Sequence, residues 1–318
     1  MKKENTLYLI IPCYDEEAVL TETTNKLTEK LNRMAETKLV SPKSKIVYVD
    51  DGSKDETWAL IKKLHKNNKY VEGVKLSKNR GHQNALLAGL MFAKEYADVL
   101  VSMDADLQDD IEVLDDFIKE YNNGSEIVYG VRSSRKKDTF FKRNTAQLFY
   151  KIMKWLGVDI IYNHADYRLM SRRAVDELEK YTETNLFLRG IIPQIGLKTS
   201  VVNYERKARF AGKSKYPLNK MLSFAIEGIL SFSVKPLRAI TLFGLIISLA
   251  SFVFLIYVVI GHFLNGNVAG WTTIVALISF FGGFQILCIG VIGEYIGKIY
   301  GETKRRPRYS IEEVLFKK

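Results

Sequence analysis

Residues 98–110 read DVLVSMDADLQDD, a short apolar run of β-forming residues that ends in acidic and amide side chains. In an extended segment residues i and i+2 point the same way, so Asp104 and Asp106 can face one ligand. Mg²⁺ and Mn²⁺ favour oxygen ligands, typically one or two carboxylates with substrate phosphates. Surface turns often carry two aspartates, but the position after a strand makes this pair a candidate metal site. Gln108 can add an amide oxygen.

Four similar apolar runs occur in the first 130 residues, at 7–11, 45–49, 73–76 and 126–129. Amphipathic helical patterns lie between the runs, at 16–34, 55–67, 81–95 and 111–121. Strands alternating with helices predict right-handed crossovers and an α/β fold with a mainly parallel, Rossmann-like sheet. Such sheets bind ligands beyond the carboxyl ends of their strands. Polar clusters stand at those ends, at 12–17, 50–53, 77–83 and 104–110.

Two of these clusters carry side chains suited to a nucleotide. Asp50 and Asp51 follow the second strand, where one carboxylate can accept the imide N–H of a uracil. Tyr14 can pack on a base, and Glu16 can accept a hydrogen bond from a ribose hydroxyl. The alternative for residues 50–53 is a turn and helix cap, and it is strong for Ser53.

The overall charge suggests an anionic partner. The chain has 47 Lys and Arg against 36 Asp and Glu, for a net charge of +11. Such an excess suits nucleic acid, anionic lipid or phosphorylated substrates, but no aromatic-basic interleaving or zinc-finger spacing favours nucleic acid. Cys13 and Cys288 lie in apolar runs of different halves, so we expect no disulfide and a reducing compartment. The first apolar stretch is too short for a signal peptide.

The second half of the sequence predicts a membrane anchor. Residues 217–234 form an amphipathic pattern suited to the membrane interface. The apolar segments 237–262 and 271–292 each exceed the ~20 residues that cross a bilayer. Cations on both flanks predict that the catalytic domain and both termini are cytoplasmic, although buried helices of a large soluble protein are the alternative. We therefore expect four regions: an α/β domain carrying the strand-end clusters at 1–216, an interfacial helix at 217–234, two transmembrane helices at 235–297, and a basic tail at 298–318.

The chain resembles family 2 of the glycosyltransferases, in the branch with dolichyl-phosphate mannose synthases and bacterial polyprenyl-phosphate (bactoprenol) glucosyltransferases. The matching segments are IIPCYDEE, YVDDGSKDET, KLSKNRGHQNALLAG, MDADLQDD, YGVRSSR, DYRLMSR and RFAGKSKY, followed by the paired apolar spans. The resemblance implies a GT-A fold for the catalytic domain at 1–216, and a homo-oligomer such as a tetramer as the assembly. It implies that the nucleotide-sugar is contacted by Pro12, Tyr14, Glu16, Asp50 and Asp104. It also implies that the metal ligands are Asp104, Asp106 and Gln108. Asp15 replaces a common Asn, and Asp110 replaces a frequent Pro.

Asp166, within HADYRLM at 164–170, matches the position near the acceptor in that family. It either orients the acceptor phosphate or acts as a base, and with Asp106 it is a predicted catalytic residue. The need for a base is modest, because a lipid phosphate is already mostly ionised near neutral pH. The structural alternative is that Asp166 pairs with Arg168 or caps a turn.

Basic side chains suggest two phosphate sites, because guanidinium groups bind phosphate in a bidentate manner. We predict that Arg132 and Arg143 bind the acceptor phosphate, and that Arg209 and Lys215 bind the donor diphosphate. The cations at 304–308 read as a lipid-facing anchor. His82 and His164 lack metal spacing, so a hydrogen-bonding or structural role is expected.

The predicted reaction is an inverting transfer of a sugar to polyprenyl (undecaprenyl) phosphate at the plasma (inner) membrane, for cell-envelope glycosylation. UDP-glucose is the first choice of donor, ahead of UDP-GlcNAc, UDP-galactose and GDP-mannose. A processive polysaccharide synthase is one alternative, but it should carry Gln-x-x-Arg-Trp and more spans, whereas residues 185–190 read NLFLRG. The other is an inactive membrane-tethered scaffold, against which the intact Asp104, Asp106 and Asp166 argue.

Overall fold

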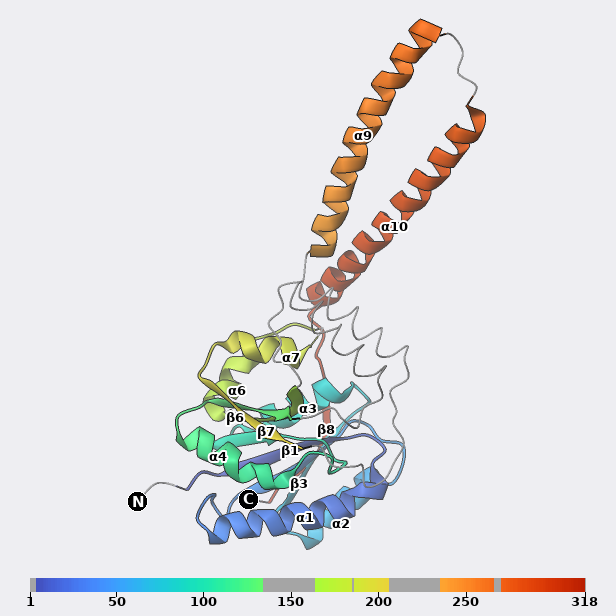
Figure 1. Cartoon of the computed structure of the whole chain (residues 1–318). Helices are drawn as coiled ribbons and strands as arrows, with labels where there is room; N and C mark the ends of the chain where they lie inside the picture. Colours follow the sequence, from blue (N-terminus) through green and yellow to red (C-terminus); the bar gives the residue numbers. More distant parts are fainter. Residues whose placement is uncertain (1–3, 134–163, 185, 206–234, 266–269, 318) are drawn as a thin grey trace. The chain divides into compact units, whose positions relative to one another are not determined.

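A computed structural model describes residues 4–133, 164–184, 186–205, 235–265 and 270–317 (Figure 1). The chain divides into two compact units. One contains the described residues up to 205 together with 306–317, and the other contains 235–305. The predicted interfacial helix at 217–234 lies outside the described residues.

The first unit is built on an eight-stranded mixed sheet with the order β7-β5-β6-β4-β1-β2-β3-β8. Its strands are β1 (Leu7–Cys13), β2 (Lys45–Asp50), β3 (Val71–Leu76), β4 (Val99–Ser102), β5 (Ile127–Arg132), β6 (His164–Ser171), β7 (Thr199–Tyr204) and β8 (Ile311–Leu315). β1 is parallel to both β2 and β4, and β2 is parallel to β3. All five strands expected from the apolar runs are present, and the predicted α/β fold class is confirmed.

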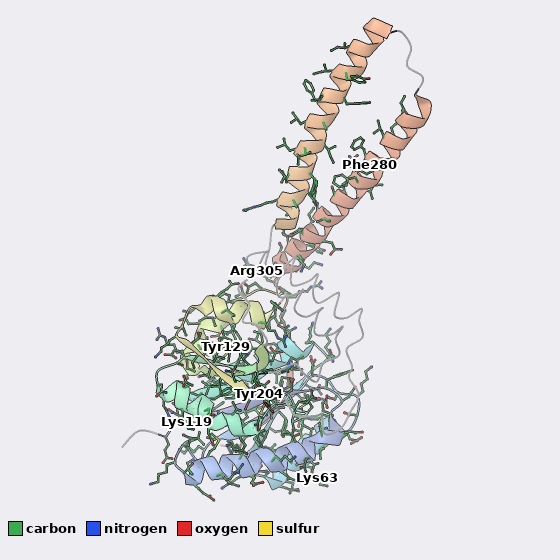
Figure 2. All side chains as sticks on the ribbon, in the orientation of Figure 1. Lys63, Lys119, Tyr129, Tyr204, Phe280 and Arg305 are labelled. Atoms are coloured by element: carbon green, nitrogen blue, oxygen red, sulfur yellow. The ribbon has the colours of Figure 1, made fainter. Side chains whose placement is uncertain are left out.

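Helices cover both faces of this sheet. They are α1 (Glu17–Glu36), α2 (Thr57–Asn67), α3 (His82–Ala93), α4 (Leu114–Asn122), α6 (Arg172–Glu179) and α7 (Leu188–Ile191), with short 3₁₀ turns η1 (Ile111–Val113) and η2 (Ile192–Ile195). The main core lies between the sheet and α1, α2 and α4. On the other face α3 packs on β1 and β2 so closely that a Cβ on Gly89 would lie 2.5 Å from the Ile10 side chain and 2.6 Å from the Val49 side chain. Figure 2 shows Tyr129 and Tyr204 inside this unit, and both are buried.

The sequence analysis missed three strands. β6 runs antiparallel between β4 and β5, so β5 does not adjoin β4 as a simple parallel order would have it. β7 extends the sheet beyond β5 in parallel. β8 comes from the segment expected to be only a basic tail, and it pairs antiparallel with β3. The indole of Trp58 donates to Glu313 at 2.9 Å and secures this edge strand.

The second unit consists of α9 (Lys235–Asn265) and α10 (Trp271–Thr303). Both helices are long and apolar enough to cross a membrane by length and composition. Many of the large apolar side chains that are described on these helices are exposed, as at Phe280 (Figure 2). α10 continues well past residue 292, where the apolar pattern predicted that the second span would end.

Candidate active site

Polar loops meet at the carboxyl edge of β1, β2 and β4, where the sequence predicted a site. β6 starts at the same edge because it runs antiparallel to β4, and this brings Asp166 beside the end of β4. The Ser102 hydroxyl of β4 donates to the Asp166 carbonyl oxygen at 2.6 Å. The clusters at 12–17, 50–53, 77–83 and 104–110 are therefore joined by a fifth group of residues from β6.

The loops after β1 and β2 hold each other in place. The Asp15 amide donates to the Ser53 hydroxyl at 3.0 Å, and the Lys54 amide donates to the Asp15 carboxylate at 2.8 Å. The Glu16 amide donates to Thr57 Oγ1 at 2.9 Å. Asp15 has φ +51°, a region in which Asn and Asp are the favoured non-glycine residues. The replacement of Asn by Asp at this position therefore keeps the backbone geometry.

Asp50 and Asp51 are both buried, but they have different partners. Asp51 accepts from the Arg80 amide at 2.6 Å and from the Gly81 amide at 2.8 Å, so it holds the loop after β3. One oxygen of Asp50 accepts from the Ser53 amide at 3.2 Å. The other, Oδ2, has no hydrogen-bond partner among the described residues. Burial raises the pKa of both carboxyls. Of the two aspartates, only Asp50 has a carboxylate oxygen, Oδ2, that could accept a hydrogen bond from a ligand without losing one from the described residues.

Gly52 is required by the close approach of these two loops. It has φ +68°, and a Cβ there would lie 2.7 Å from the Asn79 amide nitrogen and 2.8 Å from the Lys78 carbonyl carbon. A side chain at this position would push the loop after β3 away from Asp51.

The acidic loop after β4 presents one exposed and one buried aspartate. The Asp104 side chain is 37% exposed, whereas Asp106 is only 7% exposed and accepts from the Gln108 amide at 3.1 Å. Between them, the Ala105 carbonyl accepts from the Thr23 hydroxyl of α1 at 2.7 Å. This bond fixes the backbone from which both carboxylates project.

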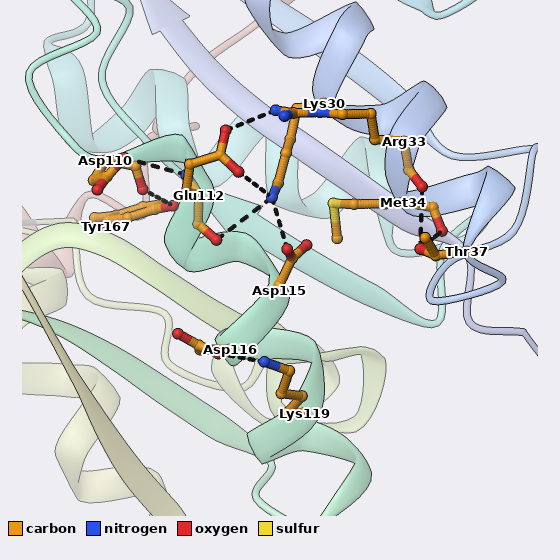
Figure 3. A network of polar contacts seen from close by, with 10 residues as sticks. All are labelled: Lys30, Arg33, Met34, Thr37, Asp110, Glu112, Asp115, Asp116, Lys119 and Tyr167. Atoms are coloured by element: carbon orange, nitrogen blue, oxygen red, sulfur yellow. Dashed lines mark hydrogen bonds and ion pairs between the residues drawn. The ribbon is translucent and has the colours of Figure 1, made fainter.

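A buried lysine anchors the end of the same loop (Figure 3). Lys30 of α1 is 2% exposed and pairs with Glu112 at 2.8 Å and Asp115 at 2.9 Å. The Asp110 side chain accepts from the Glu112 amide at 3.3 Å and so caps η1, and the Asp110 carbonyl accepts from the Tyr167 hydroxyl at 3.1 Å. Asp110 therefore starts this turn by capping it, in place of the proline frequent in the resembled family.

The residues of the acidic loop fit a divalent cation by their chemistry. Within the described part of the chain there is no cluster of three or more His, Cys, Asp or Glu side chains arranged for a metal ion. A site of two carboxylates needs no such cluster, because Mg²⁺ is commonly bound by one or two carboxylates plus substrate phosphates. Asp104, Asp106 and the amide of Gln108 supply hard oxygen donors of this type.

Asp166 is the centre of a charged cluster. It pairs with the buried Arg168 and accepts two bonds from Arg189, from Nη2 to Oδ2 at 2.9 Å and from Nε to Oδ1 at 3.3 Å. His82 Nε2 lies 3.9 Å from Asp166 and 3.9 Å from Asp104. Burial alone would raise the pKa of this carboxyl, but Arg189, Arg168 and His82 hold it well below its ordinary value. The pair with Arg168, the structural alternative considered for Asp166, is present.

Arg132 at the end of β5 faces the acidic loop. Its Nε donates to the Tyr204 hydroxyl at 3.4 Å, and its Nη2 lies 3.9 Å from the Asp109 carboxylate. The Tyr204 hydroxyl in turn donates a hydrogen bond to Asp109. The other predicted phosphate-binding residues, Arg143, Arg209 and Lys215, lie outside the described residues.

The sequence analysis missed Arg189 and gave His82 only a hydrogen-bonding or structural role. Arg189 lies more than twenty residues from Asp166 along the chain, in the short helix α7. The only local signal was a lone arginine in the apolar segment NLFLRGII. His82 is the first residue of α3, directly after Gly81 at φ +87°. The sequence signal for His82 was its position at the first residue of a helix, directly after a strand-end loop, where side chains can reach the site.

Comparison with known proteins decides the family. The sequence profile described as "Glycosyl transferase family 2" matches residues 8–179, more than half of the chain. The chain belongs to glycosyl transferase family 2. The predicted resemblance is therefore confirmed, and this protein is a glycosyltransferase with a GT-A-like fold.

Relatives of this family 2 glycosyltransferase match it over nearly the full length. An "Uncharacterized glycosyltransferase YkoT" of Bacillus subtilis is 54% identical over 99% of this chain and 94% of its own. The "Prophage bactoprenol glucosyl transferase homolog" of Escherichia coli is 38% identical, and the "Bactoprenol glucosyl transferase" of Shigella phage SfX is 39% identical. Each of these two matches covers 96% of this chain and 98% of the relative.

One solved structure that resembles this glycosyltransferase is glucosyl-3-phosphoglycerate synthase from Mycobacterium tuberculosis in complex with phosphoglyceric acid. The TM-score is 0.47 at 18% identity, and the match covers 72% of this chain and 80% of that one. The family assignment rests on the sequence matches alone.

Proposed function

We propose that this glycosyltransferase transfers glucose from UDP-glucose to a polyprenyl phosphate, with inversion at C1 of the sugar. The observation that carries the proposal is the match to two proteins named for bactoprenol glucosyl transfer over 96% of the chain. That match includes both apolar helices as well as the sheet. A polyprenyl chain is held in a bilayer, so an enzyme acting on it gains from a membrane anchor.

The donor is proposed to lie across β1, β2 and β4. The open acceptor atom of Asp50 suits the imide N–H of uracil, with Pro12, Tyr14 and Glu16 around the nucleoside. The diphosphate would then lie at Asp104, Asp106 and Gln108, with Arg209 and Lys215 as further cationic contacts. A Mg²⁺ or Mn²⁺ ion held by the acidic loop would neutralise charge on the leaving diphosphate.

The acceptor phosphate is proposed to bind on the other side of the acidic loop, where Arg132, Arg143 and Asp166 are the predicted residues. There a phosphate oxygen attacks C1 from the face opposite the diphosphate. The new C1–O bond forms as the bond to the UDP oxygen breaks, so an α-linked donor gives a β-linked lipid product. The phosphate is already largely ionised near neutral pH, so the step needs little help from a protein base.

We further propose that α9 and α10 cross the plasma (inner) membrane as a hairpin. Lys235 and Arg238 lie at the start of the first apolar segment, and a run of cations at 304–308 follows the second. The positive-inside rule then puts the catalytic unit and both termini in the cytoplasm. We also propose that the protein forms the homo-oligomer that the resemblance implies.

A donor panel tests the proposed function. The purified full-length protein, in vesicles with undecaprenyl phosphate, is incubated with labelled UDP-glucose, UDP-GlcNAc, UDP-galactose or GDP-mannose. We expect a glucosylated lipid phosphate, formed fastest from UDP-glucose and lost with chelator. Transfer from another donor at a higher rate would overturn the sugar assignment. A water-soluble polymer as the product would overturn the acceptor assignment.

A further inference from the structure

Tyr204, the last residue of β7, places its hydroxyl between two charged side chains. The hydroxyl donates a hydrogen bond to the Asp109 carboxylate of the acidic loop and accepts one from Arg132 Nε at 3.4 Å. Burial and the neighbouring Asp109 raise the pKa of Tyr204, so the hydroxyl keeps its proton and remains a donor to Asp109. Because only 3% of Tyr204 is exposed, the hydroxyl acts on a ligand only through these two partners.

The guanidinium of Arg132 is bonded at one nitrogen and open at the other two. Its Nε is bonded to Tyr204, whereas its Nη2 lies 3.9 Å from Asp109, beyond hydrogen-bonding distance. Neither Nη1 nor Nη2 makes a hydrogen bond within the part of the chain that the structure describes. The side chain is 20% exposed, and neither nitrogen is a buried group. Two terminal nitrogens of this kind match two oxygens of a phosphate.

Three elements of the fold meet at Tyr204. Arg132 and Tyr204 are register partners on the parallel strands β5 and β7, so their side chains lie on the same face of the sheet. The Ser133 amide and hydroxyl donate to the Tyr204 carbonyl at 2.9 and 3.1 Å, which holds the ends of the two strands together. Asp109 brings in the acidic loop, where it directly follows the predicted metal ligand Gln108. Tyr204 therefore links the guanidinium of Arg132 to the loop at which the donor diphosphate is proposed to lie.

We infer that Tyr204 is a positioning residue for the acceptor phosphate. Its hydroxyl keeps Arg132 in one orientation beside the acidic loop, and the two open nitrogens of Arg132 bind the phosphate there. Without the hydroxyl the long arginine side chain would take other rotamers, and binding would have to restrict them again. The inference rests on the proposed function, in which the acceptor is a phosphate monoester bound at Arg132.

The alternative is that the Tyr204 hydroxyl only stabilises the fold, and Tyr204→Phe separates the two roles. The ring of Tyr204 packs edge-on against Tyr167, with ring centroids 5.4 Å apart, and phenylalanine keeps this packing. The acidic loop also keeps its other anchors, because the Tyr167 hydroxyl donates to the Asp110 carbonyl at 3.1 Å and the Thr23 hydroxyl donates to the Ala105 carbonyl at 2.7 Å. We therefore expect the donor side of the site to survive this substitution.

Calorimetry of farnesyl phosphate binding to the detergent-solubilised full-length protein tests the inference. Arg132→Gln should weaken binding by roughly ten- to more than a hundredfold, because charge-assisted hydrogen bonds are lost. Tyr204→Phe should weaken it by about three- to tenfold, which is the cost of ordering one arginine side chain. The affinity of Tyr204→Phe for UDP, measured with Mn²⁺, should stay within about twofold of wild type.

Tyr70→Phe is the matched control. Tyr70 is 4% exposed, and its hydroxyl donates to the Asn32 side chain at 2.6 Å. It directly precedes β3 and so lies at the amino end of the strand, away from the edge that carries the site. Tyr70→Phe should lower the unfolding temperature, as the loss of any buried hydrogen bond does, and leave both affinities unchanged.

A double substitution separates positioning from a general loss of structure. If Tyr204 acts through Arg132, adding Tyr204→Phe to Arg132→Gln should weaken farnesyl phosphate binding by less than about twofold more, because the two residues act as one unit. A purely structural role would give losses that add in the double variant and that affect UDP and farnesyl phosphate alike.

The outcomes separate the inference from the proposed function. Unchanged farnesyl phosphate affinity in Tyr204→Phe, additive losses in the double variant, an equal loss of UDP affinity, or no binding by wild type would each overturn the inference. Binding that depends on Tyr204 and Arg132, by a wild-type protein that transfers no sugar to lipid, would support the inference and refute the proposed function. Lipid glucosylation by wild type together with unchanged binding in Tyr204→Phe would do the reverse.

Discussion

The open oxygen of Asp50 makes a sharp prediction about nucleotide recognition. In Asp50→Asn the amide oxygen can keep the bond from the Ser53 amide at 3.2 Å. The NH₂ group then takes the place of Oδ2, so that a donor faces the imide N–H of uracil where an acceptor stood. The lost charge-assisted bond is worth about 1.5–3 kcal/mol, which weakens UDP binding by roughly ten- to more than a hundredfold.

Calorimetry with UDP and N3-methyl-UDP measures this effect directly. Wild type should prefer UDP, whereas Asp50→Asn should bind the two nucleotides with similar, weak affinity. Asp51→Asn is the matched control. Both oxygens of Asp51 accept from backbone amides, at Arg80 and Gly81, so this change should lower the unfolding temperature and leave the preference for UDP over the methylated nucleotide. If Asp50→Asn still discriminates as wild type does, Asp50 does not read the base.

Three further predictions follow from the acidic loop and its neighbours. Asp104→Asn in the variant and chelator in wild type should each abolish lipid glucosylation, and transfer that is undiminished by either treatment would contradict the proposed metal. Removing Glu112 and Asp115 together leaves the ammonium of Lys30 buried and unpaired, so urea unfolding should show a loss of about 3–5 kcal/mol, against a smaller loss in Lys30→Met. The pKa of Asp166 is lower in the folded protein than the ordinary carboxyl pKa of 3.8. The ionised Asp166 should therefore contribute its full stabilisation at any pH above 3.8, and this contribution should be lost only as the pH falls below that value. The measurement is the difference in unfolding free energy between wild type and Asp166→Asn as a function of pH. If this difference disappears at a pH well above 3.8, the pKa of Asp166 is not depressed in the folded protein.

The parallel half of the fold was predictable because its strands are continuous apolar runs with polar residues after them. β1, β2 and β4 are buried on both faces, so hydrophobicity alone marks them. The same reasoning placed Asp50 and Asp104 at one edge of the sheet, because parallel strands share their carboxyl end.

The remaining strands were missed for physical reasons that the residues show. In β6 the buried Arg168 breaks the apolar pattern, and only the tertiary pair with Asp166 makes its burial tolerable. β8 is an exposed edge strand among lysines and glutamates, a composition that natural sheets use to protect their edges. A soluble fragment that ends near residue 216 would lose β8, so a test of the catalytic unit alone must retain residues 306–317.

Arg189 could not be found from spacing, because its link to Asp166 depends on how α7 packs on α3. The bond between Leu188 and Gln83, which spans more than a hundred residues of sequence, has no local signature.

The most direct test of the central claim is the release of UDP from UDP-glucose by the purified protein in vesicles, with and without undecaprenyl phosphate. The predicted result is release that depends on the lipid phosphate and equals the amount of β-linked glucosyl phosphate lipid formed. UDP release at the same rate without the lipid, or with no glucose appearing on it, would contradict the account.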